Sequence, residues 1–216
     1  MSEFKAVLFD LDGTLINTIN DLGNATNYML KTFSYPQHDI ESYKMKVGNG
    51  MRKLMERSLP KNHRTDEEIE KALGVFMPYY IEHSVDETVP YEDIIPLLNE
   101  LKLKNIKTAV VTNKAHISAV GLVDKFFNNL VDTVVGQTDK LPTKPSPDMV
   151  FAVTEALSVL PKECIFVGDS SVDMLTAKSS GAYAVGVTWG FRSKQELIES
   201  GADVIIDNPL EILNLL

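Results

Sequence analysis

The chain has 216 residues, of which 44% are hydrophobic and 24% charged, and its formal net charge is −9. This composition is ordinary for a folded protein with a sizeable core. The excess of negative charge argues against a nucleic acid or an anionic membrane as a partner held by bulk electrostatics. The single cysteine, Cys164, excludes an internal disulfide.

The N-terminal segment MSEFKAVLF lacks a basic start followed by a long apolar region. We therefore expect no signal peptide. No apolar stretch approaches the roughly 20 residues that span a bilayer. The simplest expectation is a cytoplasmic protein, monomeric or homodimeric.

The stretch from Phe4 to Thr18 joins an apolar run to two aspartates. Residues 6–9 predict a buried strand, and Asp10 and Asp12 follow it directly. Residues two apart in an extended segment point the same way, so both carboxylates are expected to project into one small volume. The two negative charges repel each other unless a shared proton, a cation or water offsets them.

Residues 20 to about 84 show helical periodicity and hardly any strand signal. Thr65 and Glu68 have the spacing of a capping box that starts a long helix. The turn at 48–50 separates two shorter helices. This segment predicts a small all-helical cap domain.

From about residue 89 the pattern alternates between helices and strands. The expected strands are 107–112, 130–136, 163–168, 183–188 and 203–206, and the expected helices are 93–104, 116–127, 147–160, 171–180, 193–201 and 210–216. Such alternation is typical of a parallel sheet covered on both faces. The predicted fold is therefore α/β, with a Rossmann-like parallel sheet.

The first strand must belong to this sheet, because the helical insert offers it no partner strands. The predicted core domain comprises residues 1–16 and 86–216, and the predicted cap domain comprises residues 17–85. Ligands of open parallel sheets bind at the carboxyl ends of the strands. Polar side chains follow the predicted strands there: Asp10, Asp12, Thr112, Asn113, Lys144, Asp169 and Asp173.

Four carboxylates on one sheet edge cannot all ionise unopposed. A hard cation with oxygen ligands resolves this, and Mg²⁺ is the default where carboxylates work beside phosphate. Lys144 adds positive charge, and Thr112 and Asn113 supply neutral donors. The set suits a phosphoryl dianion, and a carboxylate can serve as the nucleophile.

Each piece also has an ordinary structural interpretation. Asp-Gly is a common turn pair, Thr112-Asn113 and the residues after 168 can cap helices, and a loop lysine such as Lys144 is usually solvated. The order of the pieces and their shared place at one sheet edge favour a functional site over coincidence.

Together these motifs resemble the haloacid-dehalogenase-like phosphohydrolases. The resemblance rests on Asp10-Leu11-Asp12-Gly13-Thr14-Leu15, on Thr112-Asn113 after an apolar strand, on Lys144, and on Gly168-Asp169-Ser170-Ser171-Val172-Asp173. It covers essentially the whole chain, and it implies an enzyme with an inserted cap domain that closes over the site.

The resemblance also implies a role for each acidic residue. Asp10 would be the nucleophile and a Mg²⁺ ligand. Asp12 would be the general acid and base, and its carbonyl would also contact the metal. Asp169 would bind Mg²⁺, and Asp173 would bind or orient it.

The substrate contacts follow in the same way. Thr112 and its neighbouring amides would hold the phosphoryl oxygens, which Lys144 would neutralise. In the insert, the start of a short helix offers backbone N–H groups that favour an anion; Arg52 beside it is equally consistent with a solvated surface residue. The residues predicted to bind the substrate are Thr112, Asn113 and Lys144 in the core and Gly48, Asn49 and Arg52 in the insert.

Within the family, residues 47–50 and 186–190 are similar to phosphoglycolate phosphatases, so 2-phosphoglycolate is the leading candidate among small phosphorylated metabolites. Asn17-Thr18 departs from the Asp-Ser of many relatives at the predicted cap hinge. A pyrophosphatase, a 5′-nucleotidase and a β-phosphoglucomutase-like sugar-phosphate mutase stay open as alternatives. A binding or regulatory protein on the same scaffold would lack one of the catalytic residues, all of which are present here.

Overall fold

The computed structural model describes residues 4–216 and divides the chain into two compact units. Unit 1 ends its first segment at Ile16 and resumes from Pro90 to Leu216, whereas unit 2 is Asn17–Val89. The short strands β2 (Ile16–Asn17) and β3 (Val89–Pro90) pair with each other where the chain crosses between the units. Residues 1–3, at the start of the N-terminal segment and of the predicted core domain, lie outside the described residues.

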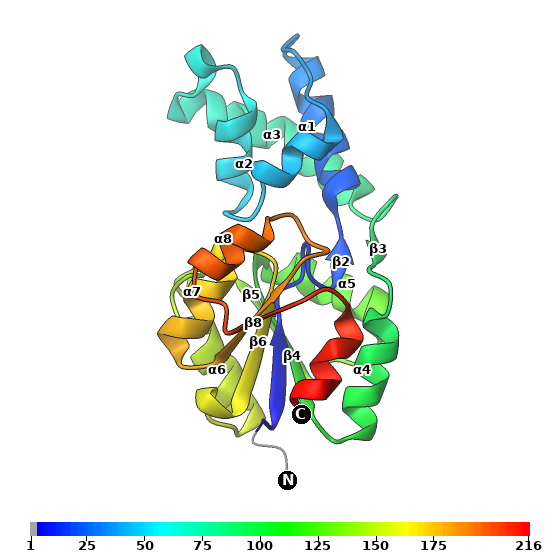
Figure 1. Ribbon diagram of the computed structural model, residues 1–216. Helices are drawn as coiled ribbons and strands as arrows, with labels where there is room; N and C mark the ends of the chain where they lie inside the picture. The colour runs from blue at the N-terminus through cyan, green and yellow to red at the C-terminus, as the bar shows by residue number, and fades with distance from the viewer. Residues whose placement is uncertain (1–3) are drawn as a thin grey trace. The chain divides into compact units, whose positions relative to one another are not determined.

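Unit 1 is built on a six-stranded sheet (Figure 1). Its strands, in spatial order, are β5 (Thr133–Gln137), β4 (Lys107–Ala115), β1 (Ala6–Phe9), β6 (Cys164–Gly168), β7 (Tyr183–Val187) and β8 (Val204–Ile206). All of their pairings are parallel. The predicted parallel α/β sheet is confirmed, with β1 completely buried between β4 and β6.

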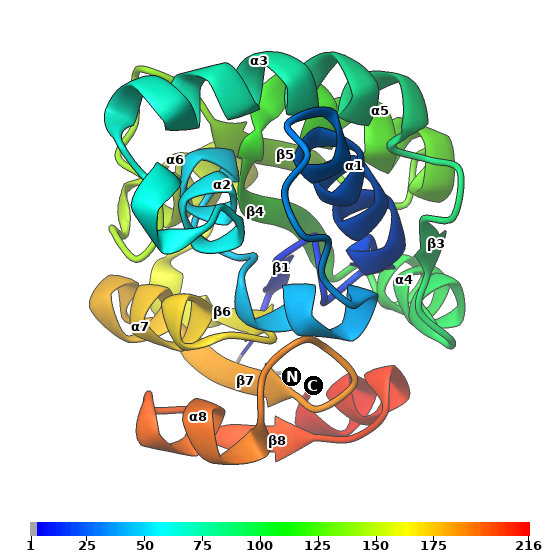
Figure 2. The same ribbon diagram turned by 90° about the horizontal axis from the view of Figure 1, so that it is seen from above.

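Helices cover both faces of this sheet. On one face lie α6 (Asp148–Leu157), α7 (Ser171–Ser180) and α8 (Lys194–Glu199), whose buried side chains join those of the strands in one apolar core. The opposite face carries α4 (Ile94–Leu103), α5 (His116–Phe127) and the 3₁₀ helix η4 (Pro209–Leu215) (Figures 1 and 2). A short 3₁₀ turn, η3 (Pro161–Glu163), leads into β6.

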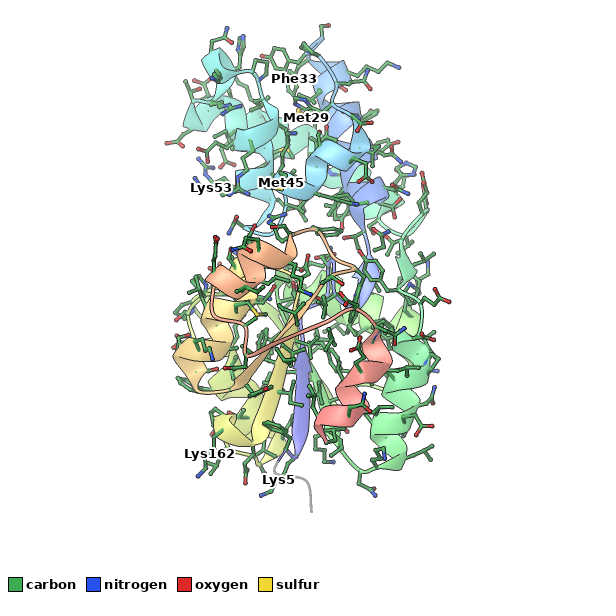
Figure 3. All side chains as sticks on the ribbon, in the orientation of Figure 1. Lys5, Met29, Phe33, Met45, Lys53 and Lys162 are labelled. Atoms are coloured by element: carbon green, nitrogen blue, oxygen red, sulfur yellow. The ribbon has the colours of Figure 1, made fainter. Side chains whose placement is uncertain are left out.

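Unit 2 is helical, as its periodicity predicts. It consists of α1 (Ile19–Thr32), η1 (Ile40–Met45), α2 (Met51–Ser58), η2 (Lys61–His63) and α3 (Asp66–His83). Met29 is fully buried among these helices, whereas Met45 and Lys53 are exposed (Figure 3). Thr65 and Glu68 form the expected reciprocal capping box at the start of α3.

Ser193 and Glu196 have the spacing of a capping box at the start of α8, but the box is only half formed. The Ser193 hydroxyl accepts the Glu196 backbone N–H at 3.2 Å. The Glu196 carboxylate accepts instead from the backbone N–H of Ser171, at 3.3 Å. The Glu196 side chain thus bonds to a residue distant in sequence instead of completing the capping box.

The chain returns to unit 1 at Pro90, whereas the sequence placed this crossing near Asp86. The buried carboxylate of Asp21 in α1 accepts hydrogen bonds from the backbone N–H groups of Glu87 and Thr88 and from the Thr88 hydroxyl. These bonds hold the returning segment to unit 2. None of the helices within residues 4–216 is long and apolar enough to cross a membrane.

Candidate active site

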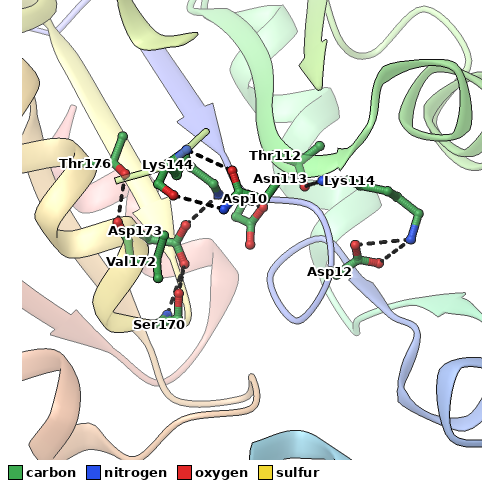
Figure 4. A network of polar contacts seen from close by, with 10 residues as sticks. All are labelled: Asp10, Asp12, Thr112, Asn113, Lys114, Lys144, Ser170, Val172, Asp173 and Thr176. Carbon is green, nitrogen blue, oxygen red and sulfur yellow. Dashed lines mark hydrogen bonds and ion pairs between the residues drawn. The ribbon is translucent and has the colours of Figure 1, made fainter. Parts of the chain in front are cut away.

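The candidate site lies at the carboxyl end of β1. Asp10 follows the last residue of this strand, and its backbone N–H donates to the carbonyl of Val167 in β6 at 2.9 Å. Because β1 lies between β4 and β6, residues that follow these three strands meet at one sheet edge. This edge contains all of the core residues predicted to act, and Figure 4 shows most of them together.

Lys144 is the centre of the charged group. Its ammonium lies 2.9 Å from a carboxylate oxygen of Asp10 and 2.6 Å from one of Asp173 (Figure 4). The lysine side chain is 2% exposed and that of Asp173 is 1% exposed, so this is a buried ion-pair network. The second oxygen of Asp173 accepts from the hydroxyl and the backbone N–H of Ser170. Asp173 therefore fixes Lys144 beside Asp10.

Asp169 is held from the other side by the loop after β7. One of its carboxylate oxygens accepts the backbone N–H of Phe191 at 2.7 Å. A Cβ at Gly190 would lie 2.2 Å from the Cβ of Asp169, and a Cβ at Gly13 would lie 2.5 Å from its carboxylate. Both glycines are needed because the backbone passes this close to the aspartate, and Gly13 also has a positive φ of 89°.

The carboxylates of Asp10, Asp169 and Asp173 are close enough to hold a metal ion. Each offers an oxygen, and these oxygens lie within 4.8 Å of one another. Burial and the neighbouring carboxylates of Asp173 and Asp10 raise the pKa of Asp169 well above its usual value. Such a group of oxygen ligands, short of positive charge, fits a hard divalent cation.

The pKa values of Asp10 and Lys144 are shifted as well. Burial raises the pKa of Asp10 to about 6, because it outweighs the attraction of Lys144. Burial also opposes the charge on Lys144, but Asp10 and Asp173 outweigh it and raise the pKa of the ammonium. Lys144 therefore stays charged, while the carboxylates around it carry more negative charge than one lysine neutralises.

The predicted strand 107–112 continues to Ala115, and its pairing with β5 shifts register between Val111 and Ala115. Such an irregularity re-aims side chains at the end of a strand. Thr112 is buried, and its hydroxyl accepts the backbone N–H of Lys114 at 3.2 Å. Asn113 uses its amide on the backbone of Lys144, with contacts of 2.8 and 3.1 Å. The substrate roles of Thr112 and Asn113 stay predictions, while Asn113 visibly positions Lys144.

Asp12 is turned away from the three clustered carboxylates. Its two oxygens accept from the ammonium of Lys114 at 3.0 and 3.2 Å, whereas Asp10 faces Lys144 (Figure 4). The alternation of an extended strand, which predicted one shared volume, does not apply here, because the strand ends at Phe9 and Asp12 forms an isolated bridge with Ile16 across the turn at 13–15. The metal contact predicted for Asp12 involved its carbonyl and stays a prediction.

The predicted substrate residues of the insert belong to unit 2. Asn49 accepts from the guanidinium of Arg57 at 2.8 Å, and Gly48 has a positive φ of 101°. Arg52 forms ion pairs with Asp66 and Glu70. These contacts show structural roles within unit 2, and the role of Gly48, Asn49 and Arg52 in substrate binding stays a prediction.

The sequence places Lys114 and the loop after β7 at this sheet edge, but it assigns neither Lys114 nor Trp189 a role in the site. Lys114 directly follows the recognised Thr112-Asn113 pair, but nothing in the sequence distinguishes its ammonium from a solvated one. Trp189 donates its indole N–H to the carbonyl of Thr14 at 3.0 Å, which fastens the loop to the turn after Asp12.

Comparison of the chain with known proteins identifies its family. The model of the haloacid dehalogenase-like hydrolases matches residues 7–187. "Phosphoglycolate phosphatase 1" of Pseudomonas aeruginosa is 33% identical, over 97% of this chain and 78% of its own length. The phosphoglycolate phosphatase of Pasteurella multocida is 32% identical over the full length of both chains.

Solved structures agree. A Lactobacillus delbrueckii protein superposes with a TM-score of 0.93 at 31% identity, covering 98% of this chain and 97% of its own. A haloacid dehalogenase-like family protein from Streptococcus pneumoniae has a TM-score of 0.89 at 26% identity, covering 99% of both chains. The chain therefore belongs to the haloacid dehalogenase-like hydrolase family.

Proposed function

We propose that this protein is a Mg²⁺-dependent phosphatase that hydrolyses a small phosphorylated metabolite through an aspartyl-phosphate on Asp10. The observation that carries the proposal is the buried group in which the carboxylates of Asp10, Asp169 and Asp173 lie together and Lys144 pairs with Asp10 and Asp173. The names of the relatives from P. aeruginosa and P. multocida make 2-phosphoglycolate the first substrate to test.

The chain's own residues account for the first half of the reaction. A carboxylate oxygen of Asp10 attacks phosphorus, and the bond from phosphorus to the leaving oxygen breaks. Asp12 gives a proton to that oxygen, and the alcohol leaves. Lys144 stays charged in this environment, so it offsets charge on the phosphoryl group as the group transfers.

The second half restores the enzyme. Asp12, now a carboxylate, takes a proton from water, and the water oxygen attacks phosphorus of the aspartyl-phosphate. The bond from phosphorus to Asp10 breaks, which releases inorganic phosphate and returns both aspartates to their starting states. When bound at the three carboxylates, Mg²⁺ would supply the positive charge that lets them and a phosphoryl dianion share one volume.

The test compares kcat/KM for 2-phosphoglycolate, pyrophosphate, a nucleoside monophosphate and a sugar phosphate, with Mg²⁺ and with a chelator. We expect hydrolysis that requires Mg²⁺ and is lost in Asp10→Asn. The matched control Asp203→Asn removes an exposed aspartate paired with Lys178 and should leave the rate unchanged. Turnover that survives chelation, or full activity of Asp10→Asn, would refute the mechanism. Conversion of a sugar 1-phosphate to its 6-phosphate would identify a mutase instead.

A further inference from the structure

The proposed reaction assigns no role to the ion pair between Lys114 and Asp12. Lys114 lies in β4, 102 residues from Asp12 in the sequence, and its ammonium contacts both oxygens of that carboxylate. The lysine side chain is 2% exposed and the Asp12 side chain 22%. The two aspartates of the first motif are thus held by two different lysines, Asp10 by Lys144 and Asp12 by Lys114 (Figure 4).

This pair differs from the surface ion pairs of the same unit. Exposed pairs contribute little, because water screens them and either partner can move freely. A buried ammonium that loses its partner is left as an uncompensated charge, which costs free energy. The pair is therefore maintained, and the lysine holds the carboxylate in place. The N–H of Lys114 also donates to the Thr112 hydroxyl, which fixes the lysine's backbone within the irregular end of β4.

We propose that Lys114 is a positioning residue for Asp12: it holds the acid–base carboxylate in one orientation and acts on the reaction only through it. The inference rests on the proposed function, in which Asp12 transfers the protons. A carboxylate gripped at both oxygens has little rotational freedom, and acid–base catalysis requires a group within hydrogen-bond reach of the reacting oxygen.

The test is a double-mutant cycle with Lys114→Met, Asp12→Asn and the double variant, assayed with Mg²⁺ on the best substrate. Misplacement of a catalytic group by about 1 Å costs up to about 100-fold. We therefore expect Lys114→Met to lower kcat by about 10- to 100-fold, with KM nearly unchanged. In the Asp12→Asn background the same change should have no further effect, because the group that it positions is already gone.

Two further variants keep the result interpretable. Lys114→Arg retains a charged donor and should recover part of kcat, whereas Lys114→Gln replaces Lys114→Met if the latter does not fold. Lys178→Met is the matched control: it breaks an exposed lysine–aspartate pair of the same unit and should leave kcat unchanged. A further loss of kcat in the double variant, or a rise in KM alone, would show direct contact with substrate and overturn the proposal.

The denaturation midpoints of the same four proteins provide a readout that needs no substrate. If the pair holds Asp12, the two single substitutions are not additive, and the double variant is more stable than their sum predicts. Additive midpoints would overturn the inference even if the protein hydrolysed none of the phosphate esters tried. A wild-type protein without phosphatase activity but with strong coupling would refute the proposed function alone.

Discussion

At the scale of single residues, the site depends on how closely the backbone approaches Asp169. Gly190 and Gly13 pack against this carboxylate, and the N–H of Phe191 donates to it. The indole of Trp189, the only tryptophan of the chain, anchors the same loop on Thr14. The loop after β7 therefore fixes the direction of a carboxylate in the candidate metal site.

Gly190→Ala should weaken the site without unfolding the protein. A Cβ at this position would lie 2.2 Å from the Cβ of Asp169 and 2.5 Å from the Gly13 carbonyl, so the aspartate must move. We expect the apparent affinity for Mg²⁺ to fall about 10- to 100-fold, the usual cost of disturbing the support of a metal ligand. The Mg²⁺ dependence of the rate and the fluorescence of Trp189 both measure this.

The matched control for this change is Gly121→Ala. A Cβ at Gly121, within α5, meets nothing within 4 Å, so alanine should be tolerated or should stabilise the helix by up to about 1 kcal/mol. If Gly190→Ala bound Mg²⁺ as tightly as this control, the loop would have no role in aiming Asp169.

At the scale of elements, the start of α7 serves two purposes at once. Ser170 and Asp173 form its capping box, and Asp173 also pairs with Lys144. The sequence offered a helix cap and a metal-site motif as alternative interpretations of these residues. In the structure both interpretations hold for Asp173, whose carboxylate caps the helix and also belongs to the cluster with Asp10 and Asp169. The irregular end of β4 likewise carries Thr112, Asn113 and Lys114 on one short segment.

Helix α1 holds the segment that returns to unit 1, through the side chain of Asp21. This carboxylate is 2% exposed and accepts from Glu87 and Thr88. Asp21→Asn replaces a charged acceptor by a weaker one and puts an amide N–H among donors. We expect a loss of about 2 kcal/mol in the free energy of unfolding, the range for hydrogen bonds to charged groups.

Chemical denaturation measures this loss, and amide hydrogen exchange should quicken first at Glu87 and Thr88. Asp39→Asn, at an exposed aspartate without a side-chain cap bond, is the control and should change stability little. Equal stabilities of the two variants would mean that Asp21 does not hold the return segment.

At the scale of the whole molecule, folding forces several negative charges together. Asp10 is far in sequence from Asp169 and Asp173, and the strand order brings all three to one edge. Burial raises the pKa of Asp10 from 3.8 to about 6. The folded protein therefore keeps this proton over a pH range in which the unfolded chain has lost it.

This predicts a pH dependence of stability for the metal-free protein. The contribution of Asp10 is fully present below about pH 4 and is lost as the pH rises through about 6. A shift of this size corresponds to about 3 kcal/mol. In chelator, the free energy of unfolding of the wild type relative to Asp10→Asn should fall by this order across that range.

Mg²⁺ should reverse the loss, because a bound cation favours the ionised carboxylates. At 100 times its dissociation constant it would add about 2.7 kcal/mol to the wild type, and less to Asp10→Asn. Urea denaturation at several pH values measures both effects, with the exposed Asp124→Asn as a control that should follow the wild type. A pH-independent difference between wild type and Asp10→Asn would refute the raised pKa.

The sequence by itself determined the parallel sheet, the helical insert and the identity of the acidic residues at the site. These features are local: the period of apolar residues and the place of Asp10 after a buried strand follow from the chain alone. Family resemblance added the roles, and the family itself is confirmed. The ends of elements were less certain, as at β4, because register shifts depend on neighbouring strands.

Only the tertiary structure decided which charges meet. It placed Lys144 between Asp10 and Asp173, turned Asp12 toward Lys114, and gave Asp169 its support from the loop at Gly190. These contacts join residues that are far apart in sequence, and no local pattern encodes the direction of a side chain beyond the end of a strand. Long-range packing sets those directions, and with them the charged groups that each aspartate faces.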